Sequence, residues 1–349
     1  MSSMDKRELI SPVITGILVI GLLYVARSVF GPLAFSLFVI ALVWPLQIAL
    51  QRYLPKLLAL FITLMLTAIV IVTVGSAIVW GFTRVGQWLI ANTARLEAAY
   101  LGWGDWLEGH GIAIAGPITE KFDVTWFVGF LRATAQRLQS SAGFAGLVFV
   151  FVMLGLLEVD DFNNRLKRPA AQPYGIKILR ANAAIGRKLR RFMLVRSFAS
   201  VLTGLGIWIF ALGTGLELAA AWGAIGFALN YIPFLGSFVA TLFPTLFAIA
   251  QYDSWQMVVT IFAGLNVIQF ITGSYIEPRL TGATLTISPF AVIFAVFFWS
   301  FMWGLPGAFI GVPILIAFAV YCEQQPSSRW LAVLLSSKSP EKNGRLISG

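Results

Sequence analysis

The 349-residue chain contains 58% hydrophobic and only 11% charged residues, whereas an average soluble domain carries about 25% charged residues. This composition, with 29 Phe and 12 Trp, excludes an ordinary soluble globular protein and indicates a surface that faces lipid. The net charge of +10 does not indicate a nucleic-acid partner, because the cations lie in segments beside apolar spans and no soluble domain is large enough to offer a binding face.

Six unbroken apolar segments are candidates for membrane-spanning helices, because a bilayer core needs about 20 apolar residues. In chain order they cover residues 10–26, 28–50, 57–82, 143–157, 197–212 and 255–273. Two further apolar runs, 219–250 and 287–321, are each longer than one crossing and are interrupted by Pro and Gly. The sequence therefore predicts an all-α integral membrane protein, a multi-span helical bundle.

Each broken run consists of two apolar arms around a knot, which is NYIPFLGS at 230–237 in the first and WGLPGAF at 303–309 in the second. Irregular backbone at membrane depth survives only where it lines a cavity or is covered by protein, and paired broken segments mark the binding site of secondary transporters. The stretches GSFVA at 236–240 and GAFIG at 307–311 match, which indicates an inverted repeat, although the spacing then slips by two residues. We predict two re-entrant hairpins; two ordinary kinked helices are the alternative.

The distribution of Lys and Arg predicts the orientation, because cytoplasmic loops carry an excess of both. Of the 25 cations, 19 lie before Ile10, in 51–56, in 158–196, at Arg279 and in the C-terminal tail, and six lie at Arg27 and in 84–141. Both termini are therefore expected in the cytoplasm. The first hairpin is expected to enter the membrane from outside and the second from the cytoplasm.

These features divide the chain into five parts. Residues 1–83 hold N-terminal spans with an expected role as scaffold and in oligomerisation, and 84–141 form an outer amphipathic segment. Residues 142–196 hold the fourth span and a basic cytoplasmic helix, for which anionic lipid is the expected partner. Residues 197–322 form the transport core with both hairpins, and 323–349 form a cytoplasmic tail.

Enzyme chemistry is not expected from this sequence. The single histidine, His110, cannot build a His-based metal site or triad within one chain, and the single cysteine, Cys322, cannot form an intrachain disulfide. No Gly-rich loop ends in Gly-Lys-Ser/Thr, as nucleotide hydrolysis would require. We predict no enzyme activity, no cofactor and no metal site.

The candidate substrate-binding residues are polar side chains of the core and the residues that shape the knots. Asn230 and Gln269 can each donate and accept hydrogen bonds, which suits a small hydroxyl-rich solute. Glu277 lies between core spans with Arg279 as its expected partner; it either forms a structural pair or handles substrate or a proton. The predicted site comprises Asn230, Pro233, Gly236, Ser237, Asn266, Gln269, Glu277, Arg279, Pro306 and Gly307.

Several motifs together resemble the autoinducer-2 exporter (AI-2E) family. They are LTGLG at 202–206, the knot at 230–237, IEPRLTG at 276–282, Leu285 with Ser288-Pro289, WGLPGA at 303–308 and Val312-Pro313. The resemblance covers most of the chain and is most specific from Arg196 to Val320. Two earlier positions depart from the family: Trp44-Pro45 stands where Asn-Pro is usual, and Glu158-Val-Asp160 where Arg-Asp-Gly is usual.

The resemblance implies a bacterial inner-membrane carrier with two helical hairpins, an elevator-like architecture and a pentameric homo-oligomer. It also implies export of the quorum-sensing signal autoinducer-2 or a similar small polar solute. In such a carrier Asn230, Ser237, Asn266 and Gln269 are expected to line the cavity. A sodium or cation/proton antiporter, with Glu277 as the exchanging acid and protons or sodium as coupling ions, is the alternative, and a membrane scaffold without transport is a third.

Overall fold

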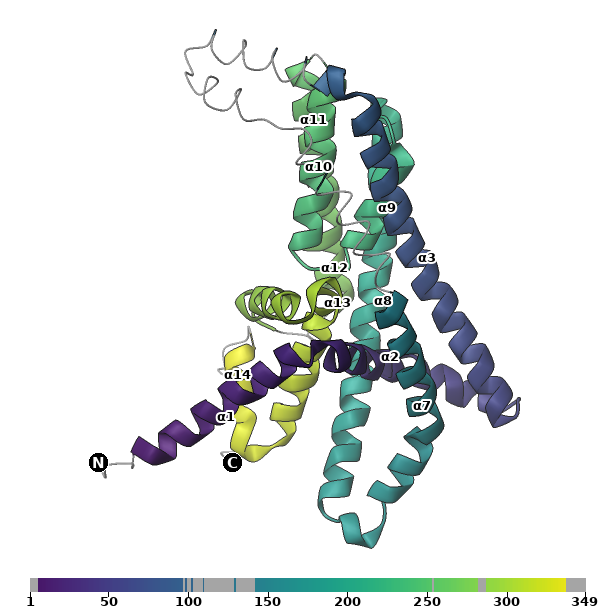
Figure 1. The fold of residues 1–349 in the computed structure, drawn as a ribbon, viewed down its shortest axis with the longest axis vertical. Coiled ribbons are helices and arrows are strands. Elements are labelled where there is room, and N and C mark those ends of the chain that lie inside the picture. The colour runs from purple at the N-terminus through teal and green to yellow at the C-terminus, as the bar shows by residue number, and fades with distance from the viewer. Residues whose placement is uncertain are drawn as a thin grey trace, which may run out of the picture. The chain divides into compact units, whose positions relative to one another are not determined.

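The structure is a computed structural model, and it describes residues 6–96, 98, 102, 109, 129, 142–252, 254–281 and 287–336 (Figure 1). This described part is helical and contains no β-strand, only an isolated bridge between Ile287 and Ser336. Most of the predicted outer amphipathic segment 84–141, including His110, lies outside the described residues.

The helices follow one another with short connections. They are α1 (Lys6–Val25), α2 (Arg27–Gln51), α3 (Lys56–Ala91), α7 (Ala142–Leu166), η1 (Pro169–Ala171), α8 (Tyr174–Thr214), α9 (Ala219–Leu229), α10 (Leu235–Gln251), α11 (Trp255–Gln269), the π-helix η2 (Phe270–Ile276), α12 (Glu277–Thr281), α13 (Pro289–Gln324), η4 (Pro326–Ser328) and α14 (Arg329–Leu335). Six of the described helices are long and apolar enough to cross a membrane: α2, α3, α7, α8, α13 and the continuous stretch from α11 to Leu280. The predicted all-α, multi-span character is confirmed.

The predicted spans fall within these helices, with one notable difference in extent. The basic segment 177–196 and the predicted span 197–212 belong to a single helix of 41 residues, α8. The predicted span 10–26 corresponds to α1, in which Ile14–Val25 forms a shorter apolar stretch. The two broken runs correspond to α9–α10 and to α13.

The chain divides into two compact units. Unit 1 comprises Met1–Thr67, Gly143–Arg190 and Leu285–Gly349, and unit 2 comprises Ala68–Ala142 and Arg191–Thr284. The broken run α9–α10 therefore belongs to unit 2 and α13 to unit 1.

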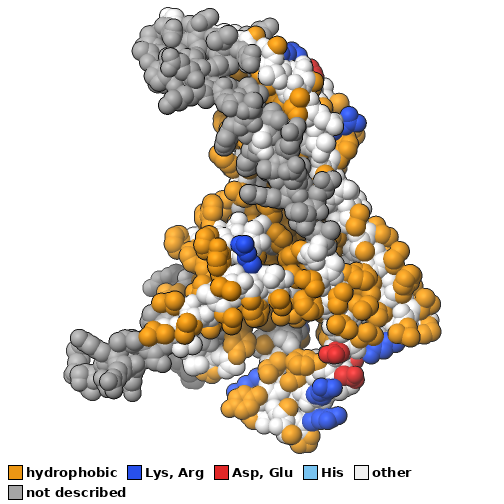
Figure 2. Space-filling model, viewed as in Figure 1, with side chains coloured by type: hydrophobic (Ala, Val, Ile, Leu, Met, Phe, Trp, Pro, Cys, Tyr) orange, Lys and Arg blue, Asp and Glu red, His pale blue; other side chains and the backbone are white. Residues whose placement is uncertain are grey.

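Large apolar side chains cover much of the surface. Phe61 and Val72 on α3 are 60% and 66% exposed, and Phe290 on α13 is 78% exposed. On the face shown in Figure 2, hydrophobic side chains dominate the described surface and charged ones are few. Such a surface would be insoluble in water, so it is consistent with helices embedded in lipid.

The core of unit 2 depends on a close crossing of α8 and α9. A Cβ atom added at Gly204 would lie 2.9 Å from the carbonyl oxygen of Gly223, and one added at Gly223 would lie 2.9 Å from that of Gly204. Only residues without a side chain allow two backbones to approach so closely. The fully buried side chains of Ile207, Trp222 and Ile261 belong to the same core.

In unit 1, α2 packs against α13 and receives a hydrogen bond from α8. The rings of Phe35 and Phe38 lie 5.9 and 6.2 Å from that of Phe309. The Arg190 Nη1 donates to the Ala41 carbonyl oxygen at 2.9 Å. That carbonyl would normally accept from the residue four positions later, which is Pro45 and has no N–H.

Candidate functional site

One face of α8 carries buried polar residues in unit 2. Arg196, Ser200 and Thr203 are spaced i, i+4 and i+7, so the helix places them on one side. Arg196 is 5% exposed and the other two are fully buried. Buried polar groups are stable only when they are hydrogen-bonded, so the partners of this face define the site.

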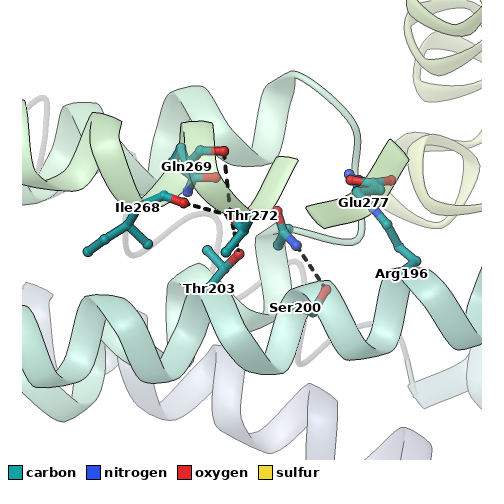
Figure 3. A network of polar contacts seen from close by, with 8 residues as sticks. Arg196, Ser200, Thr203, Ile268, Gln269, Thr272 and Glu277 are labelled. Carbon is teal, nitrogen blue, oxygen red and sulfur yellow. Dashed lines mark hydrogen bonds and ion pairs between the residues drawn. The ribbon is translucent and has the colours of Figure 1, made fainter. Parts of the chain in front are cut away.

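The partners come from the first knot and from η2, which directly follows α11; Figure 3 shows Thr203 beside Thr272 and Arg196 beside Glu277. Thr203 Oγ1 donates to Thr272 Oγ1 at 2.9 Å, and Asn230 Nδ2 donates to Ser200 Oγ at 3.2 Å. Tyr231, the next residue of the knot, donates through its hydroxyl to Ser197 Oγ at 3.0 Å. The knot is thus attached to α8 by two side-chain hydrogen bonds.

A charged pair forms the end of this polar cluster. Arg196 Nη1 lies 2.7 and 2.6 Å from the two carboxylate oxygens of Glu277, and the two side chains are 6% and 21% exposed. The predicted partner, Arg279, instead places its guanidinium carbon 3.9 Å from the centre of the Tyr275 ring. Because Arg196 is 81 residues from Glu277 in sequence, their pairing depends on the tertiary fold.

The π-helix η2 (Phe270–Ile276) connects Gln269 to this ion pair. Its wide turn lies just before Pro278, and the Glu277 N–H is bonded to the Thr272 carbonyl five residues earlier. The Thr272 hydroxyl donates to the Ile268 carbonyl at 2.8 Å. Single π-turns inside helices are often found at functional sites because they leave the regular backbone pattern.

Gln269 is the most unusual member of the cluster. It is 9% exposed, and neither its Nε2 nor its Oε1 has a hydrogen-bond partner among the described residues. An unpaired buried donor or acceptor costs about 1–3 kcal/mol. Each such unpaired group calls for an explanation, and a water or another molecule that completes its hydrogen bonds is one.

The first broken run folds back on itself at the knot. A Cβ atom added at Gly236 would lie 1.8 Å from the Leu229 carbonyl oxygen, so the residue after the turn touches the end of α9. The rings of Trp222 on α9 and Phe247 on α10 lie 5.3 Å apart. Phe234 turns the chain with a φ of 62°, which is uncommon outside glycine.

The two outer ends of this hairpin are bonded to each other. The Glu217 N–H donates to Gln251 Oε1 at 2.8 Å, and Gln251 Nε2 donates to the Gly215 carbonyl at 2.7 Å. The Tyr252 hydroxyl donates to the Thr214 carbonyl at 2.9 Å. Burial, with a smaller contribution from the charge of Glu217, raises the pKa of Tyr252, so this hydroxyl keeps its proton. The hairpin thus begins and ends at one place.

The same ends are attached to the segment at the end of α3. Arg95 Nη2 donates to the Gln251 carbonyl at 2.7 Å, and Arg95 Nη1 lies 3.6 Å from Glu217 Oε1. The Trp88 indole N–H donates to the other carboxylate oxygen of Glu217. We call the four residues Trp88, Arg95, Glu217 and Gln251 the clasp.

In unit 1, α13 also folds back, at the second knot. A Cβ atom added at Gly307 would lie 1.9 Å from the Trp299 carbonyl oxygen, and one at Gly311 would lie 2.9 Å from that of Ala295. In one straight helix, residues 16 positions apart would be separated by about 24 Å. The reversal occurs at Gly304, whose φ is 67°.

The structure brings three of the predicted residues, Asn230, Gln269 and Glu277, to one cluster. Asn266 lies on the exposed side of α11, where its Nδ2 donates to the Phe262 carbonyl at 2.8 Å. The remaining predicted residues shape turns or stack on a ring: Pro233, Gly236 and Ser237 in the first knot, Pro306 and Gly307 in unit 1, and Arg279 on Tyr275.

Sequence reasoning missed Arg196, Ser200, Thr203 and Thr272. The helical spacing of the first three within an apolar stretch was a usable signal, since it aligns polar groups on one face. Among the described residues, no group of three His, Cys, Asp or Glu side chains could hold a metal ion.

The AI-2E family transporter profile matches residues 13–326 of this chain. The chain is 26% identical to a putative transport protein of Borreliella burgdorferi, covering 94% of this chain and 90% of that protein. It is also 26% identical to the AI-2 transport protein TqsA of Escherichia coli K12, covering 90% and 92%, and 22% identical to the putative transport protein YhhT of the same strain, covering 64% and 63%. With six long apolar helices among its described residues, the chain is a multi-pass membrane protein, and it belongs to the AI-2E transporter family.

Proposed function

We propose that the chain is a secondary transporter of the bacterial inner membrane that exports a small, uncharged, hydroxyl-bearing solute, and that the cluster around Asn230 and Gln269 binds it. The observation that carries this proposal is the buried Gln269 amide, with neither polar atom paired in the described structure. A polar solute that enters the bilayer loses its water hydrogen bonds and needs protein groups to replace them. An amide with a free donor and a free acceptor supplies both.

The chemistry of the cluster favours an uncharged solute. Its charged members, Arg196 and Glu277, neutralise each other at 2.6–2.7 Å. The other members carry only hydroxyl and amide groups, which pair with hydroxyls and carbonyls of sugar-like molecules. Autoinducer-2 has this chemistry, and the E. coli relative is named an AI-2 transport protein, so it is the first solute to test.

We also infer that the hairpins are re-entrant. The α9 arm has 11 residues and is about 16 Å long, too short to cross a hydrocarbon core of about 30 Å. Its start and the end of α10 are joined through Gln251, which is expected of a hairpin that enters and leaves on one side. The inverted repeat, the elevator-like movement and the pentamer stay predictions from the sequence and the family resemblance.

The test is solute flux in vesicles reconstituted with purified protein. Asn230→Ala and Gln269→Ala each remove a hydrogen-bonding group, so we expect solute affinity to fall about 5- to 150-fold at matched protein content. Gln256→Ala, which removes an exposed amide at the start of the same helix α11, is the matched control and should retain flux. Asn266→Ala tests the sequence prediction against the structure. Wild-type affinity in both Asn230→Ala and Gln269→Ala would refute this site.

The antiporter alternative makes a different prediction for the ion pair. An acid that exchanges protons must leave its partner, but Glu277 is bonded through both oxygens to Arg196, whose side chain is 6% exposed. This geometry supports a structural role for Glu277. Sodium- and proton-driven dye signals in the same vesicles distinguish the antiporter from the solute carrier. Loss of pH-dependent exchange in Glu277→Gln, with normal exchange in Gln269→Ala, would favour the antiporter.

A further inference from the structure

Unit 1 contains a second buried glutamine with unpaired amide atoms. Gln47 on α2 is 1% exposed, and neither its Nε2 nor its Oε1 has a hydrogen-bond partner in the described part of the chain. Gln47 and Gln269 are the two described glutamines in which both amide atoms are buried and unpaired, one in each unit. Leu or Met would fill such a position without leaving polar atoms unpaired, so the amide at 47 calls for a functional explanation.

Two neighbours on α2 share this property. Trp44 Nε1 and Gln51 Nε2 are also buried without a partner among the described residues. Positions 44, 47 and 51 are spaced i, i+3 and i+7, so they lie on one face of the helix. Together they offer three donor nitrogens, which carry five N–H bonds, and one carbonyl acceptor, the Gln47 Oε1.

One backbone carbonyl of α2 that Pro45 leaves without a helical donor already has another donor. Arg190 donates to the Ala41 carbonyl, which Pro45 leaves without a helical partner. The three side chains are therefore not needed to repair the helix at Pro45.

We propose that Trp44, Gln47 and Gln51 form a second, closed hydrogen-bonding site in unit 1 for a small uncharged molecule with acceptor oxygens and at least one hydroxyl. Water and the transported solute share this chemistry. The atoms are sealed in the present conformation, so the proposal requires a second conformation in which the packing around α2 opens. This inference goes beyond the proposed function, since the cluster at Gln269 could bind solute without it.

The first test is the thermal stability of purified protein. Gln47→Met keeps the length of the side chain and removes the unpaired amide, so we expect the melting temperature to rise by about 2–4 °C while flux falls at least tenfold. Gln324→Met, at the exposed end of α13, should change neither. A lower melting temperature in Gln47→Met would overturn the proposal, because it would mean that the amide makes stabilising bonds within the chain.

The second test needs no transported solute. In a Cys322→Ser background, we expect Gln47→Cys to react with a water-soluble methanethiosulfonate reagent in vesicles, although position 47 is 1% exposed. Leu46→Cys, at a position that is 40% exposed, should stay unreactive because it faces lipid. An unreactive Gln47→Cys under conditions in which Gln269→Cys reacts would overturn the proposal.

Adding autoinducer-2 to the labelling reaction distinguishes the two candidate occupants, water and the transported solute. Slower labelling of Gln47→Cys in its presence supports the solute as the occupant, and unchanged labelling supports water. Failure of autoinducer-2 transport itself would show in the flux assay, whereas the melting temperature of Gln47→Met and the labelling of Gln47→Cys test the second site without transport.

Discussion

Two arginines in this protein donate hydrogen bonds to partly buried acceptors on other helices. Pro45 has no N–H for the Ala41 carbonyl, and Arg190 donates to that carbonyl from another helix at 2.9 Å. Arg196 similarly contacts both carboxylate oxygens of Glu277 through its Nη1 nitrogen. In both cases the Nη1 group of an arginine reaches an acceptor on another helix.

The Arg190 hydrogen bond can be tested with a double-mutant cycle. Arg190→Met should destabilise the protein by about 1.5–3 kcal/mol, the usual range for hydrogen bonds to charged groups. Pro45→Ala restores an N–H to α2, so in that background Arg190→Met should cost much less. The measurement is the free energy of unfolding in detergent, with Arg187→Met, an exposed cation on the same helix, as control. Equal costs in both backgrounds would contradict this account.

The two knots show how a short element is built from residues that permit close backbone approach. Gly236 and Gly307 each touch a carbonyl oxygen of the opposite arm, Leu229 and Trp299 respectively. In each knot a residue with positive φ, Phe234 or Gly304, precedes this contact by two or three positions. The same local device therefore reverses the chain in both units.

We expect Gly236→Ala and Gly307→Ala to abolish transport, although alanine adds only a methyl group. The new Cβ atoms would lie 1.8 and 1.9 Å from backbone oxygens, so the backbone of each hairpin must shift. Overpacking of this kind typically costs about 1–3 kcal/mol. Flux and melting temperature at matched membrane abundance are the measurements, and Gly75→Ala, with open space around its Cβ, is the control. Normal flux in both knot variants would mean that the hairpin tips are not part of the transport machinery.

The broken runs were predictable from sequence because their signals are local. Pro and Gly interrupt the apolar arms within a few residues, and the chain does fold back at both knots. The Arg196–Glu277 pair was not predictable, because it joins residues 81 positions apart and Arg279 was nearer in sequence. Asn266 and Gln269 lie on the same helix, one exposed and one buried, and the sequence alone did not show which side of α11 is buried.

The change in composition along the chain did not predict where helices end. The change from basic to apolar residues near position 196 indicated two elements, yet α8 runs through it as one helix of 41 residues. No Pro lies between 174 and 214 to break the backbone hydrogen bonds. Polarity along a helix tells where it leaves the bilayer, while its ends depend on the backbone.

At the scale of the whole molecule, most of the charge lies in a few segments and the described surface is largely apolar. Of the 25 cations, 10 lie between residues 158 and 196, around the turn that joins α7 to α8. The clasp joins the end of α3 to both ends of the first hairpin. The charge distribution predicts the orientation, and the clasp predicts that the end of α3 and both ends of the first hairpin lie on one side of the membrane.

Cysteine labelling in a Cys322→Ser background tests the predicted orientation and the predicted location of the clasp together. We expect Ala94→Cys and Ser254→Cys, both exposed, to react with a membrane-impermeant thiol reagent added outside intact cells. Residue 95 is bonded to the Gln251 carbonyl at 2.7 Å, so these two positions should lie on one side of the membrane. Asn164→Cys, in the cation-rich segment, should react only after the cells are permeabilised, because such segments stay in the cytoplasm. If α9 and α10 instead formed one kinked crossing, Ser254→Cys would be protected together with Asn164→Cys, and the re-entrant hairpin would be wrong.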